Sequence, residues 1–280
     1  MKTIGLVDFF ISEWHANNYP AWVNEICEKK GLDFCIKYAW AQEDISPVDG
    51  RSTDEWCEHF GVEKCQSLSE LCEKSDYILV LAPSNPEKHL EYAKEVFKYH
   101  KNTYIDKTFA TDYAEAKKIF DLAKETGTRF FSSSALRYAT ELDEFAGSTS
   151  VITLGGGRLF DEYIIHQVEM VQKIIDEKPK AVRVESQGAQ YVCSVAFEND
   201  KNATIIFANA LPFEVCVQKA NGESVYKSVQ SEFFKGLLAD ILNFYETGEV
   251  SFDTEQTLHV MKIREALIKG KENLGNWQQL

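Results

Sequence analysis

The chain has 280 residues, enough for two domains of ordinary size with a core each. With 44% hydrophobic and 26% charged residues, the composition is typical of a globular protein, and no repeat or low-complexity tract interrupts it. The net charge of -14 opposes binding to nucleic acids and anionic membranes, so we expect small molecules as partners.

The apolar run at the N-terminus is too short for a signal peptide. No stretch approaches the roughly 18 apolar residues of a membrane span. We therefore expect a cytoplasmic protein. The seven cysteines include no C-x-x-C pair, which indicates reduced, mostly buried thiols and predicts neither a disulfide framework nor a metal site.

The first half alternates strand-like runs with amphipathic helices. This order predicts a Rossmann-like, doubly wound parallel sheet over residues 1–133. Tyr77–Ala82 is nearly continuous in apolar residues, so we expect it at the sheet centre. The other expected strands are Ile4–Val7, Phe34–Ala41, Thr103–Asp106 and Arg129–Phe131, and the expected helices are Tyr19–Lys30, Asp54–Phe60, Leu68–Lys74, Pro86–Tyr99 and Asp112–Lys124.

The second half, residues 134–280, changes to a pattern of successive strands followed by helices. Asn199–Asn202 and Asn221-Gly222 are typical of hairpin turns, because Asn and Gly tolerate positive φ. The pattern predicts an α+β domain with a mostly antiparallel sheet. Its expected strands are Val151–Leu154, Ala181–Gly188, Gln190–Glu198, Ala203–Asn209 and Phe213–Ala220, and its expected helices are Asp161–Glu177, Ser231–Thr247 and Thr254–Gly270.

The turn after the first strand lacks glycine. In a dinucleotide site, glycines let backbone N–H groups approach the pyrophosphate at a helix N-terminus. Here Asp8 and bulky side chains occupy that stretch, and Asp8 would repel a pyrophosphate if it faced the same way. Because the next helix is expected to begin near Tyr19, the turn looks too long and too crowded for the standard arrangement.

Two interpretations of this turn stay open. In the first, polar side chains of Ser12, His15 and Asn17 or Asn18 replace the glycine amides as donors to a dinucleotide. In the second, the turn grips a substrate through Trp14 and His15. The end of the second strand carries neither a well-placed ribose-binding acid nor basic residues for a 2′-phosphate, so NADP is not favoured over NAD.

Motifs further along the chain point to a family. Ala82–Pro86, Lys101–Thr108 and Gly155–Gly157 are followed by Asp161 and His166 in an order and spacing that resemble the Gfo/Idh/MocA oxidoreductases, such as glucose-fructose oxidoreductase and inositol dehydrogenase. The resemblance implies NAD or NADP as cofactor and an N-terminal Rossmann domain. It also implies that residues 134–280 form a substrate and oligomerisation domain, with a dimer or tetramer expected.

The resemblance also assigns site residues. The family's Glu-Lys-Pro motif falls on Asp106-Lys107-Thr108, which makes Lys107 the residue at nicotinamide and substrate hydroxyl. The family's Asp-x-Gly-x-His segment makes His166 the proton acceptor. The departures are Thr108 for proline, Ile164 for glycine and the missing glycine-rich loop. The cofactor candidates are Asp8, Ser12, His15, Ala82, Pro83, Asn85 and Asp106, and the substrate candidates are Trp14, Arg137, Tyr138, Glu162 and Tyr163.

Hydride transfer from an alcohol needs a base and a cation or donor that stabilises the developing alkoxide. His166 lies away from the apolar stripe of its helix, and Lys107 follows a strand end where open sheets place ligands. Arg137 and Tyr138 either orient a polar substrate or make an interdomain contact. We therefore predict an NAD(P)-dependent oxidoreductase acting on a sugar, polyol or related hydroxy compound. The alternatives are a non-catalytic metabolite-binding or regulatory protein and, more weakly, redox-assisted hydrolysis or elimination.

Overall fold

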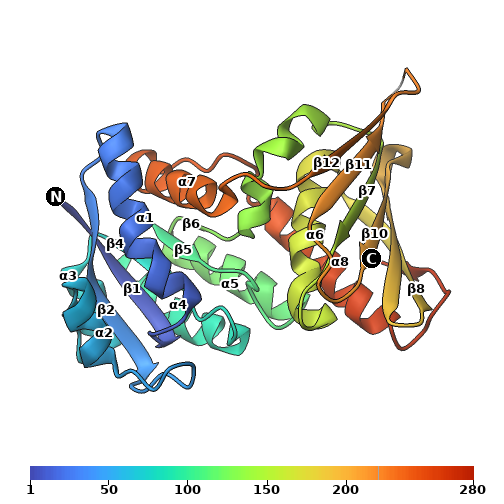
Figure 1. Ribbon diagram of the computed structural model, residues 1–280. Helices are drawn as coiled ribbons and strands as arrows, with labels where there is room; N and C mark the ends of the chain where they lie inside the picture. The colour runs from blue at the N-terminus through green and yellow to red at the C-terminus, as the bar shows by residue number, and fades with distance from the viewer. Residues whose placement is uncertain (220) are drawn as a thin grey trace. The chain divides into compact units, whose positions relative to one another are not determined.

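The computed structural model describes residues 1–219 and 221–280, which form two compact units (Figure 1). The N-terminal unit contains residues 1–133 and 238–253, and the C-terminal unit contains residues 134–237 and 254–280. Residues 238–253 therefore come from the second half of the sequence but group with the N-terminal unit. The expected strand Phe213–Ala220 ends on a residue outside the described ones.

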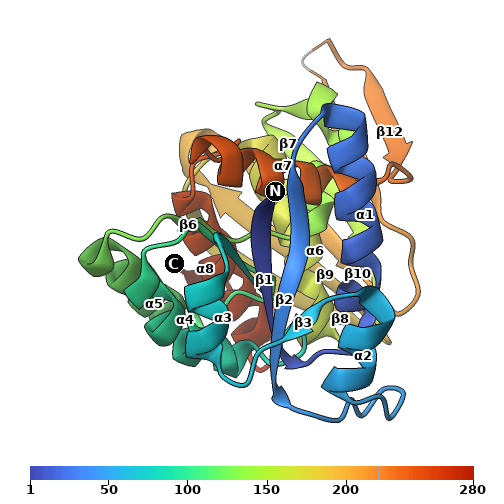
Figure 2. The same cartoon turned by 90° about the vertical axis from the view of Figure 1, so that its left-hand side faces the viewer.

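The N-terminal unit is built on a sheet of six parallel strands in the order β3-β2-β1-β4-β5-β6. This is the strand order of a Rossmann fold, so the predicted doubly wound sheet is confirmed. Figure 2 shows α1 on one side of β1 and β2, with α3 and α4 on the other. The strands are β1 (Lys2–Phe10), β2 (Phe34–Glu43), β3 (Glu63–Lys64), β4 (Tyr77–Val80), β5 (Thr103–Ile105) and β6 (Phe130–Phe131).

The helices of this unit follow the predicted pattern apart from the first. Asp112 caps α5 by accepting from the N–H of Glu115, and Gly127 ends it with a left-handed φ of 69°. Residues 86–99 form one α-helix between two short 3-10 turns where a single helix was expected. The helices are α1 (Trp14–Lys30), α2 (Thr53–Phe60), α3 (Leu68–Lys74), α4 (His89–Val96) and α5 (Tyr113–Thr126), and α7 (Phe233–Thr247) begins in the C-terminal unit and ends in this one.

The expected start of the first helix is wrong. Helix α1 begins at Trp14, so the turn after β1 contains only Ile11–Glu13 and is short. The cause is Glu13, which has an extended backbone and accepts hydrogen bonds from the first amides of the helix. Pro20, which is typical of a helix start, lies inside α1 instead. His15, Asn17 and Asn18 are therefore helical residues and not part of a loop.

The C-terminal unit contains a seven-stranded sheet in the order β12-β11-β7-β10-β9-β8-β13, and α6 and α8 pack on one of its faces (Figure 1). Among the described strands of this sheet, only β7 and β10 pair in parallel, so the prediction of a mostly antiparallel sheet is confirmed. Asn199, Asp200 and Gly222 have positive φ, as predicted for the turns in which they lie. The elements are β7 (Ser150–Gly155), α6 (Phe160–Ile175), β8 (Pro179–Gln187), β9 (Gln190–Phe197), β10 (Asn202–Phe207), β11 (Glu214–Gln218), β12 (Ser224–Ser228), α8 (Glu255–Gly270) and β13 (Gln278–Gln279).

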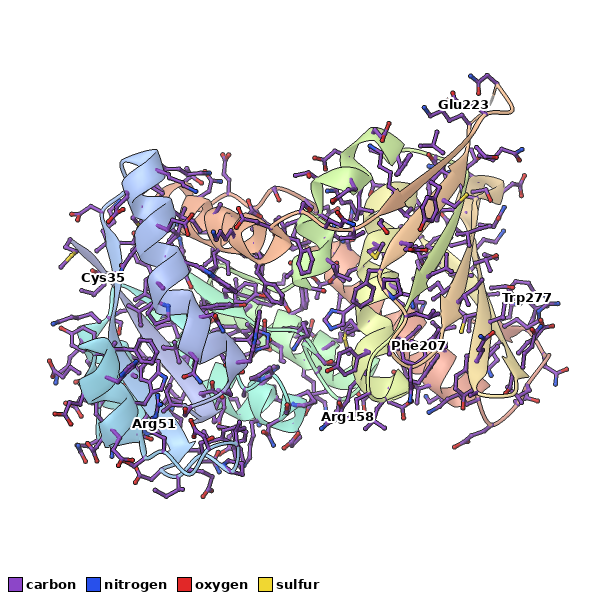
Figure 3. The ribbon with its side chains drawn as sticks, viewed as in Figure 1. Cys35, Arg51, Arg158, Phe207, Glu223 and Trp277 are labelled. Atoms are coloured by element: carbon purple, nitrogen blue, oxygen red, sulfur yellow. The ribbon has the colours of Figure 1, made fainter. Side chains whose placement is uncertain are left out.

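The sequence patterns did not predict β12 or β13, which are the two edge strands of this sheet. The strands β11 and β12 form a hairpin with Glu223 at its tip (Figure 3). All seven cysteines lie among the described residues and are free, five of them buried, as expected. No helix in the described part of the chain is long and apolar enough to cross a membrane.

Candidate functional site

The carboxyl edge of the N-terminal sheet, where its parallel strands end, holds several of the predicted site residues. Asp8 lies near the end of β1, and its Oδ1 accepts from the N–H groups of Phe9 at 2.7 Å and Ala82 at 3.1 Å. Ala82 lies just after β4 and has a positive φ of 47°, and its N–H points to the Asp8 carboxyl group. Asp8 therefore ties the end of β1 to the end of β4.

Four acidic or phenolic side chains, which we call the carboxylate cluster, converge at this edge: Asp8, Glu13, Tyr19 and Asp106. Burial raises the pKa of Asp8 well above its usual value, and the charges of Glu13 and Asp106 raise it further. Burial also raises the pKa of Tyr19, with the same two carboxylates adding to the effect. Asp8 Oδ2 and the Tyr19 hydroxyl are buried without a hydrogen-bond partner.

Glu13 occupies the N-terminus of α1. Its carboxylate accepts from the N–H of His15 at 2.9 Å and of Ala16 at 2.6 Å, and it also contacts His15 Nδ1 at 2.8 Å. These are the amides to which a Rossmann fold binds the pyrophosphate of a dinucleotide. Because a carboxylate of the chain already holds them and Asp8 lies beside them, the residues of this turn do not fit a pyrophosphate in the standard position.

The other polar residues of this region also bind within the unit. Ser12 Oγ donates to Asp49 Oδ2 at 2.8 Å, and Asn17 Oδ1 accepts from Trp56 Nε1 at 2.8 Å. Asn18 Nδ2 donates to a backbone carbonyl at 2.6 Å. The structure thus uses these side chains to hold the turn and α1 together, which leaves Glu13 and His15 as the polar groups at the helix start.

Trp14 is 50% exposed at the first position of α1. Its ring lies 5.2 Å from that of His15 and 5.6 Å from that of Trp22, both edge to face. The His15 ring in turn lies 5.7 Å from that of Tyr19, a member of the carboxylate cluster. A series of ring contacts therefore connects the buried Tyr19 to the exposed indole of Trp14.

Lys107 lies next to the cluster. Its Nζ is 3.3 Å from Asp106 Oδ2, and its side chain is 15% exposed. Asp106 Oδ1 accepts from the Tyr104 hydroxyl at 3.2 Å, which fixes the carboxyl group. Asn85 donates from Nδ2 to Glu87 Oε1 at 2.9 Å, and Pro83 beside it is half-buried. Lys107 and Asp106 are thus brought together as a pair, whereas Asn85 binds a neighbour on its own loop.

In the C-terminal unit, His166 is half-buried on α6. Its Nδ1 lies 2.7 Å from Ser134 Oγ, and its ring lies 5.7 Å from that of Tyr163 and 5.9 Å from that of Phe213. Gly157 lets the Tyr163 ring approach, since a Cβ at this glycine would lie 2.1 Å from the ring. The imidazole is thus positioned by a hydroxyl on one nitrogen and by two aromatic rings.

Arg137 and Glu169 form a buried ion pair in the same unit, with Arg137 Nε donating to Glu169 Oε2 at 2.8 Å. Arg137 Nη1 donates to Gln256 Oε1 at 2.8 Å. The other oxygen of Glu169 accepts from the N–H of Ser134 at 3.1 Å. Burial raises the pKa of Glu169, and the guanidinium opposes that shift. The ion pair therefore supports the residue that contacts His166.

Two further substrate candidates of this unit are Glu162 and Tyr138. Glu162 is exposed and its Oε2 accepts from Arg158 Nη2 at 3.3 Å. Tyr138 is half-buried, and its Cβ lies 2.8 Å from where a Cβ on Gly236 would be. Tyr163 is the substrate candidate whose ring the structure brings next to His166.

The sequence interpretation did not include Glu13 or Ser134. A signal for Glu13 was available, because an acidic residue before an aromatic and polar run can cap a helix. Ser134 belongs to the run Ser132-Ser133-Ser134 after the last strand of the N-terminal sheet, but nothing in its spacing to residue 166 indicates a contact.

Comparisons with known proteins agree with the predicted resemblance. Residues 43–134 match the Gfo/Idh/MocA family model, described as an oxidoreductase family with an NAD-binding Rossmann fold. The matched stretch begins at the last residue of β2, so it does not include β1, the turn or α1. The uncharacterized oxidoreductase YhhX of Escherichia coli (strain K12) is 37% identical over 60 residues, which are 21% of this chain and 17% of that protein.

Solved structures show the same fold over almost the whole chain. A probable dehydrogenase from Thermotoga maritima has a TM-score of 0.80 at 13% identity, covering 99% of this chain and 98% of its own. GenD2 from gentamicin A biosynthesis, in complex with NAD, has a TM-score of 0.78 at 13% identity, covering 100% and 97%. UDP-N-acetylglucosamine 3-dehydrogenase GnnA from Acidithiobacillus ferrooxidans has a TM-score of 0.74 at 12% identity, covering 96% and 97%.

Proposed function

We propose that this chain, an oxidoreductase of the Gfo/Idh/MocA type, acts on the hydroxyl group of a sugar, polyol or related compound. The family match supports the reaction class. The sugar dehydrogenase among the structures of the same fold supports the substrate class. Lys107 and His166 are the proposed catalytic residues.

The observation that carries this proposal is the contact between His166 Nδ1 and Ser134 Oγ at 2.7 Å. In the tautomer with its proton on Nδ1, His166 donates to the serine hydroxyl and Nε2 can accept a proton from a substrate hydroxyl. Lys107 supplies the positive charge that stabilises the resulting alkoxide, and Asp106 holds its ammonium group in place. These are the two groups that removal of a hydroxyl proton requires.

NAD or NADP is the cofactor that the family implies. Since the turn after β1 does not fit a pyrophosphate as it stands, we assign no step to the cofactor. The proposal requires that the Glu13 side chain give up the N–H groups of His15 and Ala16 when a dinucleotide binds.

We expect Glu13→Gln to bind NADH roughly 5- to 10-fold more tightly than the unmodified protein. The substitution removes an anion that repels the pyrophosphate and competes for the positive end of α1. Glu28→Gln, an exposed position on the same helix, is the matched control and should change nothing. Calorimetric titration measures both. Equal or weaker binding by Glu13→Gln would show that the cofactor does not approach this turn.

Ser134→Ala is expected to lower kcat about 10-fold with little change in KM, because it removes the group that orients His166. The pH profile of kcat should also move, since the histidine loses a hydrogen-bond partner. Ser148→Ala is the control, because the Ser148 hydroxyl donates to the backbone carbonyl of Phe145 and this residue is not part of the candidate site. A profile unchanged in Ser134→Ala would remove the serine from the site.

The second candidate function is a non-catalytic metabolite-binding protein on the same scaffold. The N-terminus of α1 favours it, because the Glu13 side chain already holds the N–H groups of His15 and Ala16, to which a dinucleotide would bind. An assay of NAD- and NADP-linked oxidation over a panel of sugars and polyols separates the two candidates. Formation of reduced nicotinamide supports the oxidoreductase.

We also propose that the protein is cytoplasmic and forms a dimer or tetramer. Size-exclusion chromatography with light scattering tests the oligomeric state.

A further inference from the structure

His89 is a buried histidine with no role in the reaction proposed above. It is the first residue of α4 and is 0% exposed. Its Nε2 lies 2.8 Å from the carbonyl oxygen of Leu81, and its Nδ1 lies 2.9 Å from that of Phe109. Leu81 directly follows β4, and Phe109 ends the stretch of residues 106–109, which we call the lysine segment because it contains Lys107. The ring therefore lies between the end of β4 and the lysine segment.

The lysine segment is short and is attached at both ends. At its start, the N–H of Asp106 donates to the carbonyl oxygen of Val80 at 2.9 Å. At its end, the Phe109 ring is buried against two other phenylalanine rings, and the Phe109 carbonyl oxygen contacts His89. Lys107 lies between these two attachments. The contact with His89 is thus one of the two that determine the path of the backbone on which the Lys107 side chain is carried.

The position of the proton on the His89 ring decides which carbonyl group it holds. A carbonyl oxygen only accepts, so each contact is a hydrogen bond only when the ring nitrogen that faces it carries a proton. Burial lowers the pKa of His89 and the charge of Lys107 adds to this, whereas the two carbonyl groups and the charge of Asp106 oppose it. The neutral ring, which the lowered pKa favours, has one proton. On Nδ1 that proton binds Phe109, and on Nε2 it binds Leu81.

We propose that His89 is a positioning residue for Lys107. Its ring carries a proton on Nδ1, donates to the carbonyl oxygen of Phe109 and so holds the lysine segment against the start of α4. This inference rests on the proposed function in taking Lys107 to be catalytic. It adds to that function a buried residue that acts only through the position of another side chain.

Nuclear magnetic resonance of the full chain with isotope-labelled histidine identifies the protonated nitrogen. The His89 signals are those that disappear in His89→Gln, and the couplings to the ring carbon protons distinguish Nδ1 from Nε2. We expect a proton on Nδ1, with or without a second one on Nε2. A proton on Nε2 alone would overturn the proposal, since Phe109 would then receive no hydrogen bond from the ring.

The kinetic test is a cycle of substitutions at His89 and Lys107. His89→Phe keeps a planar ring without a donor, so it should lower kcat about 10-fold with little change in KM. The same substitution in Lys107→Ala should lower kcat no further, because the residue through which His89 acts is already absent. His89→Gln, whose amide can still donate, should lose less activity, and it takes the place of His89→Phe in the cycle if that variant does not fold.

Tyr92→Phe is the matched control on the same helix. Tyr92 is buried, and its hydroxyl donates to Gln42 Oε1 at 2.9 Å, so this variant also loses a hydrogen bond, but one to β2 and not to the lysine segment. It should retain its kcat. The proposal is overturned if His89→Phe lowers kcat no more than Tyr92→Phe does, or lowers it by the same factor with and without Lys107. Full activity of Lys107→Ala would instead overturn the proposed function and this inference with it, so the two failures are distinguishable.

Discussion

Replacing Arg137 with methionine is expected to lower the free energy of unfolding of the C-terminal unit by about 3–5 kcal/mol, the usual effect of removing one partner from a buried ion pair. Glu169 is 2% exposed, and without the guanidinium its charge has no compensating cation among its described contacts. Gln256 also loses a donor. Denaturant unfolding followed by circular dichroism measures the change.

The double variant Arg137→Met with Glu169→Gln provides the control. The glutamine oxygen can still accept from the N–H of Ser134, and no charge stays buried, so the double variant should be more stable than Arg137→Met alone.

The stability of Arg137→Met should also depend on pH, in a direction set by Glu169. Burial raises the pKa of Glu169, and loss of Arg137 raises it further. As the pH falls, protonation of Glu169 removes the uncompensated buried charge, so the loss of stability in Arg137→Met should become smaller. This account would be contradicted if the difference in free energy of unfolding between Arg137→Met and the unmodified protein were the same at neutral and mildly acidic pH.

Lys107→Ala and His166→Ala are each expected to lower kcat about 100-fold or more, the range for loss of a general base or a charge-stabilising group. Their melting temperatures should change little, because neither side chain is fully buried. Steady-state kinetics with a substrate from the oxidation screen measures the loss.

Lys98→Ala and His59→Ala are the matched controls, since both residues are exposed and lie outside the candidate site. They should retain full activity. Unchanged turnover in both Lys107→Ala and His166→Ala would remove these residues from the mechanism, whatever the substrate.

Most of the fold could be predicted because apolar periodicity reports burial directly. The continuous run at Tyr77–Val80 became a central strand, and Gly127 ended its helix as the capping rules require. Pro20 did not predict the start of α1, because the helix begins earlier, where the Glu13 side chain accepts from the N–H groups of His15 and Ala16. The edge strand β12 has the polar sequence SVYKS, which carries little burial signal.

The candidate site was less predictable. Lys107 and His166 came from the family resemblance, and helix periodicity added only that His166 is not a core residue. The partners that position them are contacts between segments distant in sequence. Ser134 reaches His166 across 32 residues, and Asp8 reaches Ala82 across 74 residues. Local patterns contain no information on such pairs.

The most direct test of the central claim is calorimetric titration of the unmodified protein and Glu13→Gln with NAD⁺, NADH, NADP⁺ and NADPH, after the absorbance has been checked for copurified cofactor. If the chain is a nicotinamide-linked oxidoreductase, at least one form should bind the unmodified protein in the micromolar range and bind Glu13→Gln more tightly. If no form binds either protein, the oxidoreductase account is contradicted and the metabolite-binding function takes its place.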